Sequence, residues 1–422
     1  MIKIFLSFIL CIFCLSNANA DLIVKINRAE IGALPIMIYL DSNDESLGSK
    51  IKKIIETDLY NSGYFNVLSS SSVKNNISNS KTQYALWALA GANYFLKSKI
   101  YTENSKKYIR FDLHNVIKKE IIISYKINLG NNNIRKISHT ISNVIFEKIT
   151  GIKGIFDTKI AYISTEVVKK RKIYKLNVAD IDGYNPIAIY KSSKQIMSPT
   201  WSPNNKKIAY VSFENNKPEI FIQTLETGLR EKLPNNNYSS SAPAWSPNEK
   251  YMAFTSSIKG NLEIFVYNFY TKSIKRVTNS IGIDTEAEWD LDSEKIFFTS
   301  DRNGKPHIYS KSIKRGKAKR ITFQGNYNAD ANLSPNGHYL SLVHNGGSGH
   351  NIAIYSLKDK YFKIISTGKL DEAPSFAPNN KMILFASKKQ NKGILVATSN
   401  DGRIRTELEL DGEDVREPIW SH

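Results

Sequence analysis

Acidic residues recur just ahead of several short apolar segments in the second half of the chain. Carboxylates brought together can hold a cation, attract a basic peptide or, when about 5 to 10 Å apart, act as acid and base on a glycan. Acidic residues are also good turn formers, and two equivalent stretches, Ser198-Pro199 and Ser239 to Pro243, contain none. The sequence therefore supports a site and a purely structural role equally. The acidic residues are Asp284, Glu286, Glu288, Asp330, Asp371, Glu372, Glu413, Asp414 and Glu417.

Other patterns that carry chemistry are missing from the sequence. Gly347-Ser348-Gly349 lacks the G-x-S-x-G spacing of a nucleophile elbow, and the seven histidines form no H-E-x-x-H pair. The glycines at 346–349 lack the lysine and helix of a phosphate-binding loop. We therefore expect no catalytic residue, no cofactor and no metal site, apart from a cation such as calcium held by the carboxylates.

A repeat positions these carboxylates. Trp201-Ser202-Pro203-Asn204 begins a unit that recurs at spacings of 44, 44, 44, 43 and 44 residues. A period of about 40 to 45 residues is typical of propeller blades. Pro and Asn favour a tight reversal after the bulky residue, and three further strands follow, so each unit predicts four short antiparallel strands. The bulky residues are expected to wedge between blades, and they are Trp201, Trp245, Trp289, Leu333, Phe376 and Trp420.

Counting the repeats predicts a six-bladed β-propeller over 157–422. Five complete repeats span 196–409, and a lone first strand, Glu417 to Trp420, stands at the end of the chain. Three expected strands at 158–164, 172–178 and 185–190 follow the same order as in a repeat, but no such first strand precedes them. The last strand should therefore complete the first blade, which removes exposed sheet edges. Loops entering the inner strands then surround one mouth of the central channel, where the carboxylates would form a half-ring.

Residues 21–150 lack the repeat and predict a separate α/β domain. Alternating segments predict strands, and apolar residues at a period of 3.6 predict helices. The junction with the propeller is Gly151-Ile152-Lys153-Gly154. The expected strands are 22–26, 34–40, 64–68, 94–101, 107–114 and 120–129, and the expected helices are 47–61, 82–90 and 134–149.

Residues 1–20 read as a signal peptide. The apolar run Ile4 to Leu15 follows Lys3 and precedes small residues, so we expect cleavage between Ala20 and Asp21 and a periplasmic mature protein. Both cysteines of the chain lie in this run, and a large apolar core must replace disulfides. The run is too short to span a membrane.

The chain is strongly basic. It has 58 Lys and Arg against 39 Asp and Glu, a formal net charge of +19 that falls to +18 without Lys3. The basic residues are scattered, and short runs at 169–172 and 314–320 are interpreted as solvated loops. Export and the lack of a concentrated basic stripe argue against nucleic-acid binding, and we expect a monomer.

Several segments resemble the TolB family, the periplasmic component of the Tol-Pal envelope system of Gram-negative bacteria. The segments Asp58 to Phe65, Phe146 to Gly154 and Thr299 to Tyr309 look like family segments in the right order. The Trp-Ser-Pro-Asn units look like the family's propeller repeats, although many propellers share such units. The resemblance covers nearly all of the expected mature chain.

The resemblance implies a non-enzymatic role in outer-membrane integrity and in envelope constriction during cell division. The propeller would bind the lipoprotein Pal, which would make the protein peripheral to the outer membrane, and the N-terminal strand would engage the inner-membrane protein TolA. The TolA residues would be Leu22, Ile23, Val24, Lys25 and Ile26. The family's Pal surface matches Ser239, Ala242, Pro243, Thr285 and Glu286, to which we add the half-ring residues Asp330, Asp371, Glu372 and Glu417.

The sequence departs from the family pattern at Asp290-Leu291-Asp292, at Leu333 and at Ser239, which leaves individual contacts open. The alternative function is a propeller hydrolase or lyase that acts on envelope polysaccharide, with Asp284 or Asp371 in the reaction. A charge reversal at Glu286 is predicted to weaken Pal binding without lowering the melting temperature.

Overall fold

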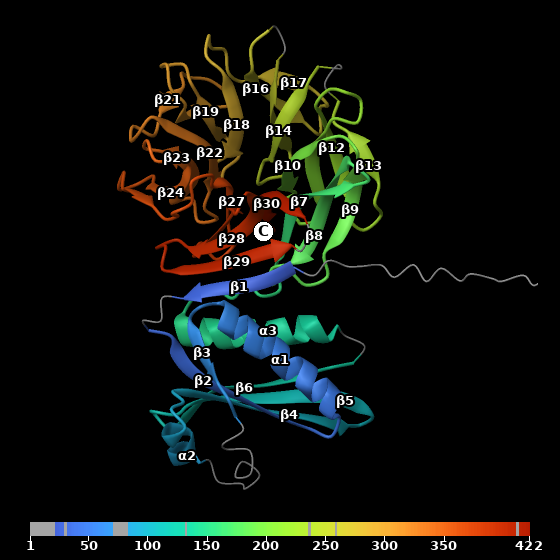
Figure 1. The fold of residues 1–422 in the computed structure, drawn as a ribbon, viewed down its shortest axis with the longest axis vertical. Helices are drawn as coiled ribbons and strands as arrows, with labels where there is room; N and C mark the ends of the chain where they lie inside the picture. Colours follow the sequence, from blue (N-terminus) through green and yellow to red (C-terminus); the bar gives the residue numbers. More distant parts are fainter. Residues whose placement is uncertain are drawn as a thin grey trace, which may run out of the picture.

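The computed structural model describes residues 22–28, 32–70, 83–130, 133–234, 238–257, 260–410 and 413–422. It consists of an α/β unit followed by a six-bladed β-propeller of antiparallel sheets, so the predicted fold class is confirmed (Figure 1). The expected signal peptide, with Ala20 and Asp21, lies outside the described residues. Within the described part of the chain, no helix has the length and apolar character needed to cross a bilayer.

The α/β unit is a five-stranded sheet whose order is β3-β2-β4-β5-β6. Strand β2 runs parallel to β3 and β4, and the rest of the sheet is antiparallel. The two long helices cover the face toward the propeller (Figure 1), and buried Ile, Leu and Phe side chains of both layers form one core. The elements are β2 (Leu34–Ser42), α1 (Glu45–Asn61), β3 (Phe65–Leu68), α2 (Tyr84–Leu89), β4 (Tyr94–Glu103), β5 (Lys106–Asn115), β6 (Glu120–Asn128) and α3 (Ile134–Thr150).

Six sheets follow around the channel, and in five of them the chain runs outward from the innermost strand. The second blade holds β10 (Ile196–Trp201), β11 (Lys207–Ser212), β12 (Glu219–Thr224) and β13 (Arg230–Lys232). The third holds β14 (Ser240–Trp245), β15 (Tyr251–Ser256), β16 (Glu263–Asn268) and β17 (Ile274–Arg276), and the fourth holds β18 (Asp284–Trp289), β19 (Lys295–Ser300), β20 (His307–Ser312) and β21 (Lys319–Arg320). The fifth holds β22 (Tyr327–Leu333), β23 (Tyr339–Asn345), β24 (Asn351–Ser356) and β25 (Phe362–Ile364), and the sixth holds β26 (Glu372–Phe376), β27 (Met382–Lys389), β28 (Lys392–Ser399) and β29 (Ile404–Leu410).

The first blade joins the two ends of the propeller, as its sequence predicts. Its innermost strand is β30 (Asp414–Trp420), which pairs antiparallel with β7 (Lys159–Val168), and β8 (Arg171–Asp180) and β9 (Ile187–Ser192) complete it. The bulky residues lie between blades as expected: the indole of Trp201 donates to the carbonyl of Ile419 at 3.3 Å, and the indole of Trp289 donates to that of Ala244 at 3.0 Å.

Strand β1 (Leu22–Arg28) is docked on the propeller, an arrangement that the sequence analysis leaves open. It pairs antiparallel with β29, from Leu22 opposite Leu410 to Arg28 opposite Ile404, and so becomes the fifth strand of the sixth blade. In Figure 1 it lies between the propeller and the helices of the α/β unit. One edge of β1 is hydrogen-bonded to β29, and the strand order places no described strand on its other edge.

Polar contacts join the α/β unit to the first blade. The Arg135 guanidinium on α3 bonds the carboxylates of Asp180 at 3.0 Å and Asp182 at 2.6 Å. At the junction, a Cβ on Gly154 would lie 2.5 Å from the Cα of Asn143, so only glycine fits this close approach of the two segments.

Candidate functional site

Every inner strand of the propeller is interrupted by a β-bulge at the same place. In all six blades the ladder shifts register after the first, second or third residue of the inner strand. One residue of each bulge has a left-handed backbone conformation. Bulges bend a strand and change the direction of its side chains, and they are common near functional sites. These six residues are Ser198 (φ 51°), Ala242 (45°), Glu286 (54°), Asp330 (52°), Ala373 (52°) and Glu417 (47°).

The six bulge residues form a ring on the wall of the central channel. All of them line one cavity of about 400 Å³, together with Glu288, Glu372 and the Tyr327–His350 pair, whose rings stack 5.0 Å apart. Three ring residues are acidic, so five carboxylates in total face this cavity. The bulge residues lie in the first part of the inner strands, close to the loops that enter them, which places the cavity at the predicted channel mouth.

Three of the five carboxylates hold neighbouring blades together. The Glu286 carboxylate accepts from the Thr299 hydroxyl at 2.8 Å and from the backbone N–H of Asp330, in the next blade, at 3.0 Å. Glu417 accepts in the same way from the backbone N–H of Ser198. These bonds satisfy backbone groups that the bulges leave unpaired.

Glu288 makes a third link of this kind. It accepts from the backbone N–H of Leu333 at 3.0 Å and from the Asn332 amide at 3.2 Å, both in the next blade. Leu333 stands where four of the other blades have tryptophan and one has phenylalanine, so the backbone bond is kept although the aromatic side chain is not.

Burial raises the pKa values of Glu286, Glu288, Asp330 and Glu417. It raises the pKa of Glu288 and of Glu417 to about 7, and it raises the pKa of Glu286. The pKa of Asp330 is raised well above its usual range by burial and then by the negative charges of Glu286 and Glu417. At neutral pH the cavity therefore keeps part of its protons, and a cation or a basic side chain that enters it will displace them.

Most of the partner-binding residues expected from the sequence lie at this mouth. Ala242, Pro243, Glu286, Asp330, Glu372 and Glu417 line the cavity. Ser239, just before β14, and Thr285, in β18, are partly buried and do not line the cavity. The Ser239 carbonyl accepts from Ser256 at 2.7 Å, and the Thr285 hydroxyl accepts from Thr255 at 3.2 Å.

Asp371 is the exception, because its side chain is fully buried between the fifth and sixth blades. Its carboxylate accepts from the hydroxyls of Ser366 and Ser387 at 2.5 and 2.6 Å and from the Gly368 N–H at 3.1 Å, and it does not line the cavity. Asp284 is buried as completely. The hydrolase or lyase hypothesis would use one of these two carboxylates, and neither offers an exposed atom to a substrate.

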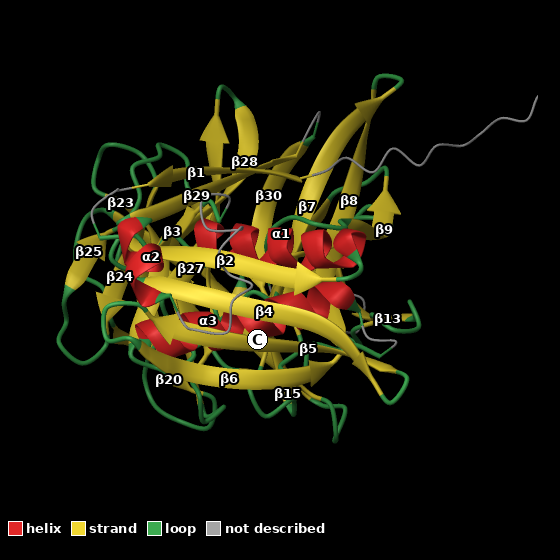
Figure 2. Ribbon diagram, turned by 90° about the horizontal axis from the view of Figure 1, so that it is seen from below, coloured by secondary structure: helices red, strands yellow, loops and turns green. Residues whose placement is uncertain are grey.

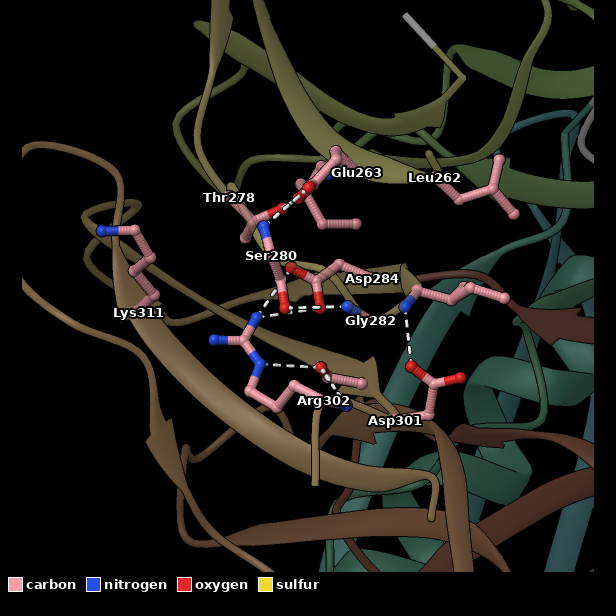
Figure 3. A network of polar contacts seen from close by, with 12 residues as sticks. Leu262, Glu263, Thr278, Ser280, Gly282, Asp284, Asp301, Arg302 and Lys311 are labelled. Carbon is pink, nitrogen blue, oxygen red and sulfur yellow. Dashed lines mark hydrogen bonds and ion pairs between the residues drawn. The ribbon is translucent and has the colours of Figure 1, made fainter. Parts of the chain in front are cut away.

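A polar network fixes the loop that leads into β18. The Arg302 guanidinium donates to both carboxylate oxygens of Asp284 at 2.8 and 2.7 Å and to the Ser300 hydroxyl at 2.8 Å (Figure 3). Glu263 accepts from the Ser280 N–H at 2.7 Å on the other side of the loop. One nitrogen, Nη2, makes both contacts to Asp284, and Nε makes the contact to Ser300. Charge-assisted hydrogen bonds to a carboxylate are strong, so this loop presents the following residues, Thr285 and Glu286, in a fixed position.

Exposed apolar side chains gather on the loops that enter the inner strands. Ile281 is 99% exposed, although isoleucine is one of the residue types most often buried. Clustered exposed hydrophobic residues mark surfaces that contact other proteins. The exposed residues on these loops are Tyr238, Ile281, Ile283, Phe323 and Leu370.

Sequence reasoning missed some of the residues that line the mouth. Ser198 and Ala373 belong to the ring and follow the 44-residue spacing, so the repeat alone could have found them. Tyr327 and His350 carry no such signal, because Tyr327 begins β22 whereas His350 lies in the connection between β23 and β24.

Outside the channel, one cluster of potential metal ligands occurs among the described residues. Ligand atoms of Asp58, His139 and Asp182 lie within 4.8 Å of one another. The guanidinium of Arg135 already neutralises Asp182 at 2.6 Å. No three channel carboxylates of the described chain lie as close together.

Comparisons with known proteins agree over both parts of the chain. Residues 22–122 match the model of the TolB amino-terminal domain, and residues 146–422 match that of the TolB beta propeller domain. A curated protein of Xanthomonas oryzae pv. oryzae (strain PXO99A), named Tol-Pal system protein TolB, is 45% identical over 406 residues, covering 94% of this chain and 92% of that protein. A protein of the same name from Xanthomonas euvesicatoria pv. vesicatoria (strain 85-10) is 47% identical over 374 residues, covering 88% and 85%.

A solved structure is also similar over nearly the whole length. The crystal structure of TolB from Acinetobacter baumannii superposes with a TM-score of 0.86 at 36% identity, covering 95% of this chain and 100% of that one. The similarity includes the α/β unit as well as the propeller.

Proposed function

Since the chain belongs to the TolB family of the Tol-Pal system, we propose that it is a non-enzymatic periplasmic interaction protein that binds the lipoprotein Pal at the channel mouth. The observation that supports this proposal best is the combination of exposed apolar side chains with an acidic cavity on one face. Exposed apolar patches mark surfaces that contact other proteins, and charged groups beside them can orient the partner.

The mouth offers two kinds of contact to such a partner. Ile281 and Phe323 supply apolar area that a partner can bury, at roughly 25 cal/mol per Å². Glu372 is exposed, and Asp330 lies deeper in the cavity, so basic side chains or N–H donors of the partner can enter the channel. We expect apolar contacts to supply most of the affinity and the carboxylates to orient the partner.

TolA is assigned to strand β1 as the second partner. The strand order leaves one edge of β1 without a described neighbour, and an extended segment of a partner can add to such an edge. Binding Pal through the propeller and TolA through β1 would place the protein between the two membranes. That position suits a role in outer-membrane integrity and in constriction during cell division.

A cation such as calcium is a second proposed occupant of the channel. Five carboxylates share the cavity, and burial raises the pKa of most of them, so a cation would relieve their mutual repulsion. No three of them lie within 4.8 Å of one another among the described residues, so some ligands would be water molecules or side chains that shift. Calorimetric titration with calcium chloride tests this proposal, and the absence of heat would refute it.

Charge-reversal variants test the Pal site. Glu286→Lys is a poor choice, because Glu286 links two blades through Thr299 and Asp330 and its replacement would also destabilise the propeller. Glu372→Lys changes the charge of an exposed residue at the mouth, and Glu231→Lys makes the same change on the outer strand β13. We expect Glu372→Lys to weaken binding of the soluble Pal domain about tenfold and Glu231→Lys to leave it unchanged. Equal affinities for both variants would remove the mouth from the interface.

A further inference from the structure

The β7–β8 hairpin of the first blade is longer than the corresponding hairpins of the other blades. Its strands have ten residues each, whereas β11 and β12 have six. Ile160 pairs with Trp420 as Ile208 pairs with Trp201, so the four additional residues of β7 lie at the end toward the turn. At about 3.3 Å per residue they extend the hairpin by about 13 Å, and Figure 2 shows it projecting beyond the propeller.

The hairpin projects from the face that carries the channel mouth. Strands of a blade alternate in direction, so the connection between the second and third strands lies at the same end as the loop entering the first strand. The β27–β28 hairpin of the neighbouring blade has strands of eight residues and points in the same direction (Figure 2). Lys388 is exposed near its tip.

The tip of the β7–β8 hairpin is a tight turn made of two lysines. Lys169 and Lys170 have φ values of 47° and 66°, and Val168 pairs with Arg171 to close the turn. Two-residue turns of this kind strongly prefer Asn-Gly, because side chains make a left-handed backbone costly. The turn therefore carries two lysines although its left-handed backbone conformation favours asparagine and glycine.

Four consecutive basic side chains at this tip are exposed to solvent. Lys169, Lys170, Arg171 and Lys172 are exposed and make no ion pair with any residue that the structure describes. The nearest acidic residue along the strand, Glu166, is bonded to Lys175 at 2.9 Å. The tip thus presents a dense positive charge to whatever lies beyond the mouth face.

Two valines expose apolar surface on both faces of the same ribbon. Val167 is 68% exposed and Val168 is 45% exposed. Adjacent strand residues point to opposite faces, so a flat protein surface could cover only one of the two side chains. The headgroup layer of a bilayer surrounds an inserted tip on all sides, and basic residues beside apolar ones are typical of segments that lie in that layer.

We propose that the β7–β8 hairpin docks on an anionic membrane surface, with its basic residues on lipid phosphates and Val167 and Val168 in the headgroup layer. The site goes beyond the proposed binding of Pal and does not depend on it, because it uses residues outside the channel mouth. It would hold the mouth face toward the membrane in which a lipoprotein partner is anchored.

Vesicle binding of the protein purified from the periplasm tests the proposal. Wild type should sediment with vesicles of phosphatidylglycerol and phosphatidylcholine and not with phosphatidylcholine alone. The variant Lys169→Asn/Lys170→Gly removes two cations and supplies the residues that the turn prefers, so it should fold at least as well. Each basic residue near an anionic surface contributes about fivefold to partitioning, and we expect this variant to bind about 25-fold more weakly.

A matched control separates the hairpin from net charge. Arg315→Asn/Lys317→Gly removes the same charge from the exposed connection between β20 and β21, at the opposite end of a blade, and should bind anionic vesicles like wild type. Equal losses in both variants, or no binding of wild type to anionic vesicles, would overturn the proposal. It would also fall if the hairpin variant lost affinity for the Pal domain while its vesicle binding stayed intact, because the tip would then be a protein contact.

Discussion

Replacing Glu288 by glutamine is expected to stabilise the propeller at alkaline pH and to have little effect at acidic pH. The glutamine side chain keeps an oxygen that can accept from the Leu333 N–H and the Asn332 amide, which bond Glu288 at 3.0 and 3.2 Å. The substitution therefore removes the charge and keeps the contacts between blades. Because burial raises the pKa of Glu288 from 4.5 to about 7, the native state holds this proton more tightly than the unfolded chain does.

The sign and size of the effect follow from this difference in pKa. A raised native pKa stabilises the fold fully below about pH 4.5, and that contribution is lost as the pH rises through 7. At about 1.4 kcal/mol per pKa unit, the loss amounts to about 3 kcal/mol above pH 8. Glutamine does not ionise, so the variant should gain about that amount there, or roughly 6 °C in melting temperature for a domain of this size.

Thermal unfolding of wild type, Glu288→Gln and the exposed control Glu231→Gln at pH 5 and pH 8.5 measures the effect. We expect the Glu288 variant alone to melt higher than wild type, and only at pH 8.5. The same difference at both pH values, or a lower melting temperature at pH 8.5, would show that Glu288 is ionised without penalty and would refute the electrostatic description of the channel.

Two further substitutions test the buried ion pairs. Arg302→Met leaves the buried Asp284 carboxylate without its cationic partner and should lower the unfolding free energy in urea by about 3 to 5 kcal/mol. A second change, Asp284→Asn, should restore most of this loss, and a fully stable single variant would contradict the account of Figure 3. His139→Ala removes the imidazole that lies 2.8 Å from the buried Asp58 carboxylate. Because burial raises the pKa of Asp58, the resulting loss of stability should grow from pH 5 to pH 8, and a pH-independent loss would mean that only packing was removed.

The repeat made most of the fold predictable from the sequence. The 44-residue spacing gave the number of blades, and the unpaired strand ending at Trp420 indicated how the ring closes. Both follow from local patterns, because each blade is a unit of consecutive strands. The docking of β1 on β29 is different, since it joins residues almost 390 positions apart, Leu22 and Leu410, and no local pattern specifies such a pair.

The candidate site was predictable in position but not in detail. Asp371 and Glu372 are neighbours, yet the first is buried between two blades and the second is exposed at the mouth. Side-chain direction at the start of a strand changes with every residue and again at a bulge, so spacing alone could not separate the two. The long β7–β8 hairpin was missed because Lys169-Lys170 lacks the residues that signal a two-residue turn.

Titration of the soluble domain of Pal from the same organism into the purified protein tests the central claim most directly. Saturable binding at a ratio of one to one, weakened by Glu372→Lys and unchanged by Glu231→Lys, is the expected result. The absence of binding, with and without calcium, would contradict the assignment of the channel mouth as the Pal site.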